Sequence, residues 1–258
     1  MGRDSATPVL ISPNWPRHPR VAACFTTRSG GNSLGPYAGF NLAQHVGDDP
    51  VAVAANRQRL RAMLKLEHEP AWLDQVHGTE VLRVRDHSQP ARADAAWTHE
   101  LGRACVVMSA DCLPVLFADD SGRHVAAAHA GWRGLLAGVL EATIAQLPVA
   151  PAALSAWMGP AIGPQAFEVG EEVCAAFCAH DPAHESAFVA VPARRYLADI
   201  YALARTRLAR SGVTRMYGGD RCTVSEPELF YSYRRQGICG RMAALIWLTQ
   251  DGAVRDIA

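Results

Sequence analysis

The sequence carries no excess of charge of either sign. Its 258 residues include 25 lysines and arginines and 25 aspartates and glutamates, so the formal net charge is zero when the histidines are neutral. This balance gives no bulk electrostatic support for a nucleic acid or an anionic membrane as partner. We therefore expect neither to bind, whereas a small basic pocket is still allowed.

Long apolar stretches are also missing. The apolar run at residues 242–248 has only the length of a strand, whereas a transmembrane helix needs about 20 residues. The first twenty residues are interrupted by Pro8, Pro13, Pro16 and Pro19, so they lack the apolar region of a secretory signal peptide. These features predict a cytoplasmic location.

A disulfide framework is not indicated either. The seven cysteines are an odd number and are scattered along a chain of medium length. In a reducing cytoplasm such cysteines stay as thiols, and most of them serve as small buried hydrophobic residues.

What is present is an ordinary globular composition, with 49% apolar and 19% charged residues. We find no internal repeat and no low-complexity linker, which favours one domain over residues 1–258 with an irregular segment at 1–20. Apolar runs of strand length at 104–109, 113–118 and 124–129 alternate with helical patterns at 134–147 and 195–211. Residues 71–98 are also strand-like, and 229–232 has the pattern of a strand. This pattern predicts an α+β fold, a mixed β-sheet with packed helices.

Cys112 and His129 form the pair with the best geometric argument. Cys112 precedes one predicted strand, His129 ends the next, and the turn-forming residues 119–122 lie near the midpoint between them. Antiparallel pairing brings such positions within a few ångströms of each other. The pair is then either a thiol beside an imidazole in a site or two packed core residues, and these readings are about equally favoured.

His77 lies on a separate segment, Asp74-Gln75-Val76-His77-Gly78, and can join the pair only through tertiary folding. From residue type alone, a histidine in a surface turn is the favoured interpretation. If it does join, the three side chains match the ligand set of an open zinc site. Cys112 with a histidine base would instead form a nucleophilic pair.

Two further residues lie near a glycine-rich loop at 30–39. Arg28 follows the predicted strand at 21–27 and either grips a phosphate or carboxylate or is simply solvated. His45 lies close to the same loop and is a candidate for the wall of a pocket. Asp111 is expected to orient a ligand or cap a turn rather than to react.

Several segments together resemble one known family, the YfiH-like proteins, variously named peptidoglycan editing factor, polyphenol oxidase (multicopper laccase) and purine nucleoside phosphorylase. The resemblance runs nearly end to end and is carried by Thr26-Thr27-Arg28-Ser29-Gly30-Gly31, Asn41-Leu42, Val46-Gly47-Asp48-Asp49, Asp74-Gln75-Val76-His77-Gly78, Ala93-Asp94-Ala95, Ala110-Asp111-Cys112-Leu113-Pro114-Val115, His129-Ala130-Gly131-Trp132-Arg133-Gly134, Gly159-Pro160-Ala161-Ile162-Gly163, Ser232-Tyr233-Arg234-Arg235 and Gly240-Arg241.

The resemblance implies a single domain related to the cysteine-hydrolase (YfiH-like) fold. It implies a metal, usually zinc with copper as the alternative, held by His77, Cys112 and His129, which would also be the catalytic residues. It implies a purine nucleoside as substrate, with Arg28 positioning phosphate and Asn41 bonding the sugar or base. The segment Gln165-Ala166-Phe167 departs from the family pattern, which often has a cysteine and a tyrosine there.

These residues and what the family resemblance implies together allow four functions. The first is a zinc-dependent enzyme that phosphorolyses adenosine, inosine or 5′-methylthioadenosine and deaminates adenosine, because zinc lowers the pKa of water toward about 7. The second is a cysteine hydrolase acting on a peptidoglycan precursor, with Cys112 as nucleophile and His129 as base. A copper polyphenol oxidase is disfavoured because paired His-X-His motifs are missing. A purely structural zinc lacks a convincing fourth ligand.

Overall fold

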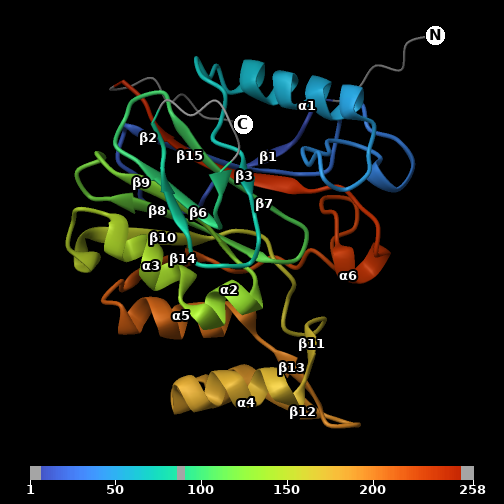
Figure 1. The fold of residues 1–258 in the computed structure, drawn as a ribbon, viewed down its shortest axis with the longest axis vertical. Coiled ribbons are helices and arrows are strands. Elements are labelled where there is room, and N and C mark those ends of the chain that lie inside the picture. The colour runs from blue at the N-terminus through green and yellow to red at the C-terminus, as the bar shows by residue number, and fades with distance from the viewer. Residues whose placement is uncertain (1–6, 86–90, 251–258) are drawn as a thin grey trace.

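Two stacked β-sheets form the centre of the protein, which a computed structural model describes over residues 7–85 and 91–250 (Figure 1). The first sheet has the strand order β1-β2-β15-β7 and is antiparallel throughout; its strands are Leu10–Ile11, Val21–Thr26, Met242–Leu248 and Ala104–Ser109. The second sheet is mixed and has the order β14-β10-β8-β9-β6-β4; its strands are Arg215–Gly218, Leu154–Met158, Leu113–Asp119, Val125–Ala130, Ala95–Thr98 and Val81–Arg83.

The remaining strands form two small sheets. One has the order β11-β13-β12 and consists of Glu168–Gly170, Arg195–Ala198 and Phe188–Val191. The other pairs β3, Leu73–Asp74, with β5, Ala91–Arg92. Several sheets with packed helices thus confirm the predicted α+β class with a mixed sheet.

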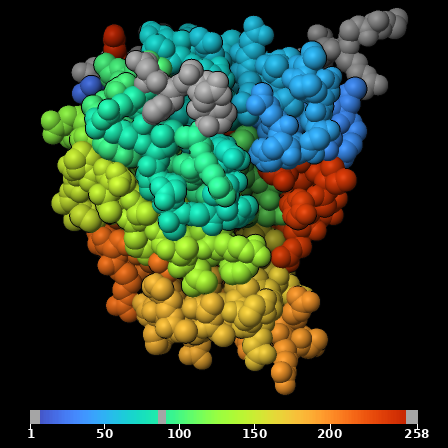
Figure 2. Space-filling model, in the orientation of Figure 1, coloured from blue at the N-terminus to red at the C-terminus, as the bar shows by residue number. Residues whose placement is uncertain are grey.

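Helices cover both outer faces of the stacked sheets. Helix α1, Pro50–Met63, lies over the first sheet, and α2, α3 and α5, which span Trp132–Ala137, Val139–Gln146 and Ile200–Arg210, lie over the second (Figure 1). Helix α4, Glu171–His180, and the three-stranded sheet form a lobe at one end (Figure 2). Short helix α6 is Tyr233–Gln236, and 3₁₀ turns occupy Gly35–Tyr37, Pro151–Ala153 and Pro182–Ala187.

The core has three apolar layers, because the central strands are buried on both faces. In β2, Ala22 and Cys24 face α1, whereas Phe25 faces the second sheet. In β8, Phe117 faces the helices α2, α3 and α5, and Leu116 faces the first sheet. Strands covered on both sides are continuously apolar, which explains the runs seen in the sequence.

Two predicted helices were wrong in part. The helix expected over 134–147 breaks at Gly138, whose φ of 102° ends α2 and starts α3. Residues 195–198 of the helix expected over 195–211 form β13 instead, and the helix begins only after Asp199, whose carboxylate caps the backbone N–H groups of Tyr201 and Ala202.

The strand-like stretch expected over 71–98 is divided into the four short strands β3 to β6, and its residues 86–90, with His87, lie outside the described residues. The strand expected at 229–232 is a buried coil, in which the Phe230 N–H bonds to the Glu226 carbonyl. Within the described ranges, we find no helix that combines the length and the apolarity needed to cross a bilayer.

Candidate functional site

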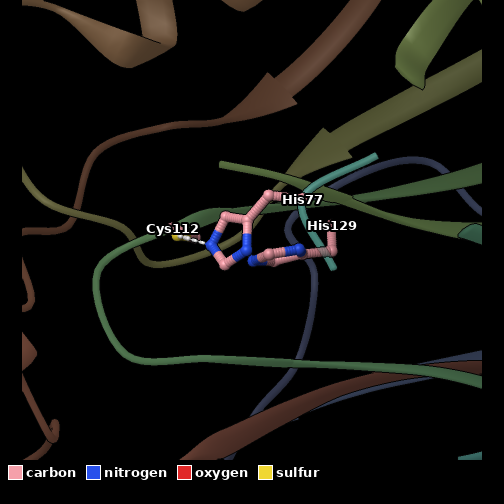
Figure 3. Close-up of side chains that lie close together, drawn as sticks. All are labelled: His77, Cys112 and His129. Carbon is pink, nitrogen blue, oxygen red and sulfur yellow. Dashed lines mark hydrogen bonds between the residues drawn. The ribbon is translucent and has the colours of Figure 1, made fainter. Parts of the chain in front are cut away.

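The structure brings His77, Cys112 and His129 into one cluster. One ligating atom from each lies within 4.8 Å of the other two, and His77 Nε2 is 3.8 Å from Cys112 Sγ (Figure 3). The two imidazole rings meet edge to face, with centroids 4.8 Å apart. Among the described residues this is the only group of three or more histidine, cysteine and acidic side chains with metal-like spacing.

The β8–β9 hairpin places Cys112 beside His129, as the sequence predicts. His129 pairs with Pro114 across the hairpin, and Cys112 lies two residues before Pro114. Residues offset by two positions across a strand pair share a face, so the thiol and the imidazole are diagonal neighbours. Cys112 also lies where the chain crosses from β7 in the first sheet to β8 in the second.

Asp94, which precedes β6, holds both histidines. Its carboxylate accepts hydrogen bonds from three successive backbone N–H groups, those of Val76 at 3.1 Å, His77 at 2.9 Å and Gly78 at 2.7 Å. These bonds hold His77 at a φ of 61°, which is uncommon for a residue other than glycine. The sequence gives no distance for His77, and this fully buried carboxylate is what places it in the cluster.

The same carboxylate orients His129. Asp94 Oδ1 lies 2.8 Å from His129 Nδ1, so Nε2 is the ring nitrogen left for the cluster. A carboxylate behind a histidine fixes the tautomer and the ring orientation, an arrangement common at metal-binding histidines. Burial raises the pKa of Asp94, but the hydrogen bonds from His129 and from the backbone outweigh it and lower the pKa overall.

The cluster favours a charged thiolate–imidazolium pair in the metal-free protein. Burial raises the pKa of the Cys112 thiol, but the charge of His129 and hydrogen bonds from both histidines lower it further than burial raises it. Burial likewise lowers the pKa of His129, and the Cys112 thiolate and Asp94 raise it more. Cys112 therefore has the deprotonated character that both a metal ligand and a nucleophile require.

Gly131 leaves the space that the cluster occupies. A Cβ atom at this position would lie 2.9 Å from His77 Cδ2 and 3.0 Å from Cys112 Sγ. Asp111, with a φ of 94°, turns its carboxylate away from the cluster. There it accepts hydrogen bonds from Thr223 Oγ1, Ser232 Oγ and the Arg234 backbone N–H, and so fixes the loop before Cys112.

The cluster opens into a cavity of about 480 Å³. Its other walls combine apolar and aromatic side chains with cationic ones: Met108, Trp132, Ile162, Phe167, Ile200 and Tyr233 on one hand, and Arg133, Arg234 and Arg241 on the other. His45 also belongs to the lining. His45 thus lies in the wall of a pocket, as its position near the glycine-rich loop indicates. A cavity of this size and lining suits a small molecule with an aromatic part and an anionic part.

Arg28 and Asn41 lie outside the wall of this cavity. The Arg28 guanidinium donates hydrogen bonds to the carbonyls of Pro227 and Ala38 and stacks on Tyr231. Asn41 is fully buried, and its amide bonds to Ala43, Asp48 and the Arg241 backbone N–H. The hydrogen bonds of Arg28 and Asn41 hold neighbouring loops together, and a contact of either residue with substrate remains a prediction.

Several site residues lie within the sequence motifs, but only the structure reveals their roles. Asp94 stands in the apolar run Ala93-Asp94-Ala95-Ala96, and a buried charge in such a run requires partners, which was the available signal. The three cavity arginines also occur within quoted segments. Phe167, in the segment that departs from the family pattern, lies in the cavity wall, and the adjacent Ala166 and Glu168 carbonyls accept hydrogen bonds from Arg234.

Fold and site together define an α+β protein with one His–Cys–His cluster at a cavity. Residues 22–249 match the family described as multi-copper polyphenol oxidoreductase laccase. The chain is 55% identical over 239 residues to a purine nucleoside phosphorylase of Pseudomonas aeruginosa, covering 92% of this chain and 98% of that protein. It is 54% identical over 240 residues to purine nucleoside phosphorylase YfiH of Escherichia coli, covering 93% and 98%.

Solved structures agree with these sequence matches. A crystal structure of a Neisseria meningitidis protein superposes with a TM-score of 0.91 at 48% identity, covering 93% of this chain and 99% of that chain. YlmD from Geobacillus stearothermophilus superposes with a TM-score of 0.87 at 30% identity, covering 96% and 98%. The chain therefore belongs to the YfiH-like family.

Proposed function

We propose that this protein is a metal-dependent purine nucleoside enzyme that cleaves nucleosides with phosphate and deaminates adenosine. The observation that carries the proposal is the His77–Cys112–His129 cluster at the base of a cavity with aromatic and cationic walls. The names of the relatives from Pseudomonas aeruginosa and Escherichia coli support the substrate class. Adenosine, inosine and 5′-methylthioadenosine are the proposed substrates.

The donor set fits zinc. Zinc bonds of about 2.0–2.3 Å to a tetrahedral centre place the ligand atoms roughly 3.3–3.6 Å apart. The 3.8 Å between His77 Nε2 and Cys112 Sγ is close to this spacing. Ligand atoms at the 4.8 Å limit of the cluster would have to approach each other by about 1.2–1.5 Å. Three protein ligands and an open position are typical of catalytic rather than structural zinc.

When bound, zinc would supply Lewis acidity, which lowers the pKa of water toward about 7 and makes it a nucleophile near neutral pH. The residues of the chain supply the rest. Asp94 keeps His129 Nε2 directed at the cluster. Trp132, Phe167 and Tyr233 offer aromatic surface for a purine ring.

Copper could occupy the same donors, because copper binds most nitrogen and sulfur sites more tightly than zinc does. A multicopper oxidase, however, needs further histidine clusters. Within residues 7–85 and 91–250 we find one cluster, which favours a single-metal site. We therefore propose zinc as the native metal and regard phenol oxidation as a reaction of the copper-loaded protein.

The second candidate function is metal-free hydrolysis of an amide or ester, such as a bond in a peptidoglycan precursor. The specific observation in its favour is the chain of contacts Cys112–His129–Asp94, in which the thiol pKa is lowered and the imidazole is oriented by a carboxylate. A nucleophile, a base and an orienting acid are the elements of cysteine hydrolases. Such an enzyme keeps its full activity after metal is removed.

One assay series tests the proposal. The purified protein is analysed for bound metal and incubated with adenosine, with and without phosphate, and the products are separated by chromatography. We expect adenine and ribose 1-phosphate to form only when phosphate is present, and inosine to form when phosphate is absent. In Cys112→Ala both activities fall by at least about 100-fold, because losing a ligand costs more than the 10–100-fold typical of residues behind the ligands.

The control is Cys178→Ala, which removes a half-buried thiol on α4 outside the cavity. We expect it to keep wild-type activity. Unchanged turnover in Cys112→Ala would refute every catalytic role for the cluster. Full nucleoside turnover in chelator-treated protein would refute the metal-dependent mechanism, whereas hydrolysis of a peptidoglycan precursor by that protein would favour the second candidate.

A further inference from the structure

Three arginines from distant parts of the chain converge on the cavity wall. Arg133 belongs to α2, Arg234 belongs to α6, and Arg241 directly precedes β15. Each guanidinium stacks on an aromatic ring of the same wall: Arg133 on Trp132 at 4.4 Å, Arg234 on Phe167 at 5.9 Å and Arg241 on Tyr233 at 5.8 Å from Cζ to the ring centroid. Stacking limits the freedom of these side chains without using their N–H donors.

The N–H donors of the three arginines are largely available. Arg133 makes no hydrogen bond or ion pair with any residue in the described ranges; its recorded contact is the stacking on Trp132. Arg234 and Arg241 donate through Nη1 alone, to backbone carbonyls and, for Arg241, also to Cys239 Sγ.

No carboxylate in the wall neutralises these guanidinium groups. Asp111 is the only acidic residue of the lining, and its two oxygens are occupied by Thr223, Ser232 and the Arg234 backbone N–H. Outside the cluster, the cavity wall therefore combines three guanidinium groups with one carboxylate, which leaves an excess of positive charge. Such a wall attracts an anion more strongly than a neutral group.

Arg133 is the arginine nearest in the chain to the cluster. A Cβ atom placed on Gly131 would lie 2.9 Å from His77 Cδ2 and 3.0 Å from Cys112 Sγ, so the Gly131 backbone lies close to both side chains. Arg133 follows two residues later, so its Cα lies within about 7 Å of that of Gly131. Arg133 and the cluster line the same cavity, so an anion held by this guanidinium would lie in the cavity into which the cluster opens.

We infer that Arg133, assisted by Arg234 and Arg241, forms an oxyanion subsite that binds inorganic phosphate. This inference rests on the proposed nucleoside function and assigns to the cavity arginines the phosphate contact that the sequence suggested for Arg28. The planar guanidinium matches two phosphate oxygens at once, which a lysine does not.

In the cleavage reaction that this subsite serves, the bond that forms is matched by the bond that breaks. An oxygen of hydrogen phosphate forms a bond to ribose C1′ while the bond from C1′ to the purine nitrogen breaks. The electron pair of that bond goes to the purine, and the proton of hydrogen phosphate ends on a purine nitrogen. The arginines neutralise the phosphate charge and hold it beside C1′ during this exchange.

The test is direct binding of radiolabelled inorganic phosphate to the metal-loaded protein by equilibrium dialysis. We expect Arg133→Ala to weaken phosphate binding about tenfold, the effect of losing one charge-assisted contact. Arg133→Lys should weaken phosphate binding about two- to fivefold, because lysine keeps the positive charge but cannot contact two phosphate oxygens in the paired geometry of a guanidinium. The KM for phosphate should rise in parallel, with the KM for the nucleoside unchanged.

Arg194→Ala is the control, because this side chain is 87% exposed and lies outside the cavity. Thermal unfolding of each variant shows whether the fold is intact. An Arg133→Ala dissociation constant equal to that of the wild type, or a wild-type protein that binds no phosphate, overturns the subsite.

The two proposals fail in different ways. If Arg133→Ala loses phosphate but the wild type makes no ribose 1-phosphate, the subsite stands and the phosphorolytic function falls. If ribose 1-phosphate forms with the same KM for phosphate in both proteins, the function stands and the subsite falls.

Discussion

At the scale of single residues, Asp94 organises the cluster. Its two oxygens accept four hydrogen bonds, three from successive backbone N–H groups around His77 and one from His129. One buried carboxylate therefore sets the backbone of one candidate ligand and the ring of another. Because it contacts neither the cavity nor a substrate position, its role is to position the groups that do.

Replacing Asp94 with Asn tests this positioning role. The amide keeps one acceptor oxygen but turns N–H donors toward the backbone N–H groups, and it loses the charge that supports His129. We expect zinc affinity to fall by about 10–100-fold and the metal-free protein to lose about 1–3 kcal/mol of unfolding free energy. Competition with a chromogenic chelator measures the first effect and urea unfolding the second.

Asp220→Asn makes the same chemical change at an exposed position and serves as the control. It should alter neither the zinc affinity nor the urea midpoint. Wild-type zinc affinity in Asp94→Asn would contradict the positioning role.

At the scale of elements, the β8–β9 hairpin sets the separation of Cys112 and His129. Its turn is closed by the side chain of Asp119, which accepts hydrogen bonds from Ser121 Oγ and from the backbone N–H groups of Arg123 and His124. The pKa of this carboxyl is raised by burial and lowered more strongly by these hydrogen bonds, so that it lies below its usual value.

The lowered pKa predicts how the hairpin depends on pH. A depressed pKa in the folded state adds stability above the unfolded value of about 3.9, and this stability is lost as the pH falls through the folded pKa. We expect Asp119→Ala to lower the unfolding free energy by about 1–3 kcal/mol at pH 7.

The difference in unfolding free energy between the wild type and Asp119→Ala should become smaller as the pH falls below 4. Urea unfolding at pH 7 and at pH 3 measures this difference. An equal difference in unfolding free energy at both pH values would contradict the role of the charged carboxylate. The variant Asp119→Asn distinguishes loss of the charge from loss of the hydrogen-bond acceptor.

The strands that are buried on both faces were predicted well, for a physical reason. Residues 104–109, 113–118 and 154–158 are apolar because sheets and helices cover both of their faces, and this signal is local. Residues 195–198 resemble a helix start, yet they pair with β11 and β12. The pairing with β11 joins residues 25 to 29 positions apart in the sequence, so the pattern of one segment cannot reveal it.

At the scale of the whole molecule, the cluster joins three separate parts of the chain. His77 follows β3, Cys112 lies at the crossover between the two stacked sheets, and His129 ends β9. A metal ion bound by all three would therefore connect a small two-stranded sheet to both large sheets. Binding only in the folded state adds to the stability of that state.

Metal binding should thus raise the unfolding temperature. At free zinc of 100 times its dissociation constant the added stability is about 2.7 kcal/mol, which corresponds to roughly 5–10 °C for a chain of this size. Differential scanning calorimetry with zinc and with a chelator measures the shift. His77→Ala should lose most of it, and Cys178→Ser, outside the cluster, should keep it; an equal shift in His77→Ala would contradict the three-ligand site.

The sequence by itself determined what is local or is carried by motifs: the family, the α+β class and the hairpin that brings Cys112 to His129. Only the tertiary structure decided the position of His77, the role of Asp94 and the convergence of Arg133, Arg234 and Arg241 on one cavity. It also placed Arg28 and Asn41 among the contacts that hold loops together. The reason is that spacing along a chain sets distances only within a turn or a strand pair, whereas a site is assembled from segments that packing brings together.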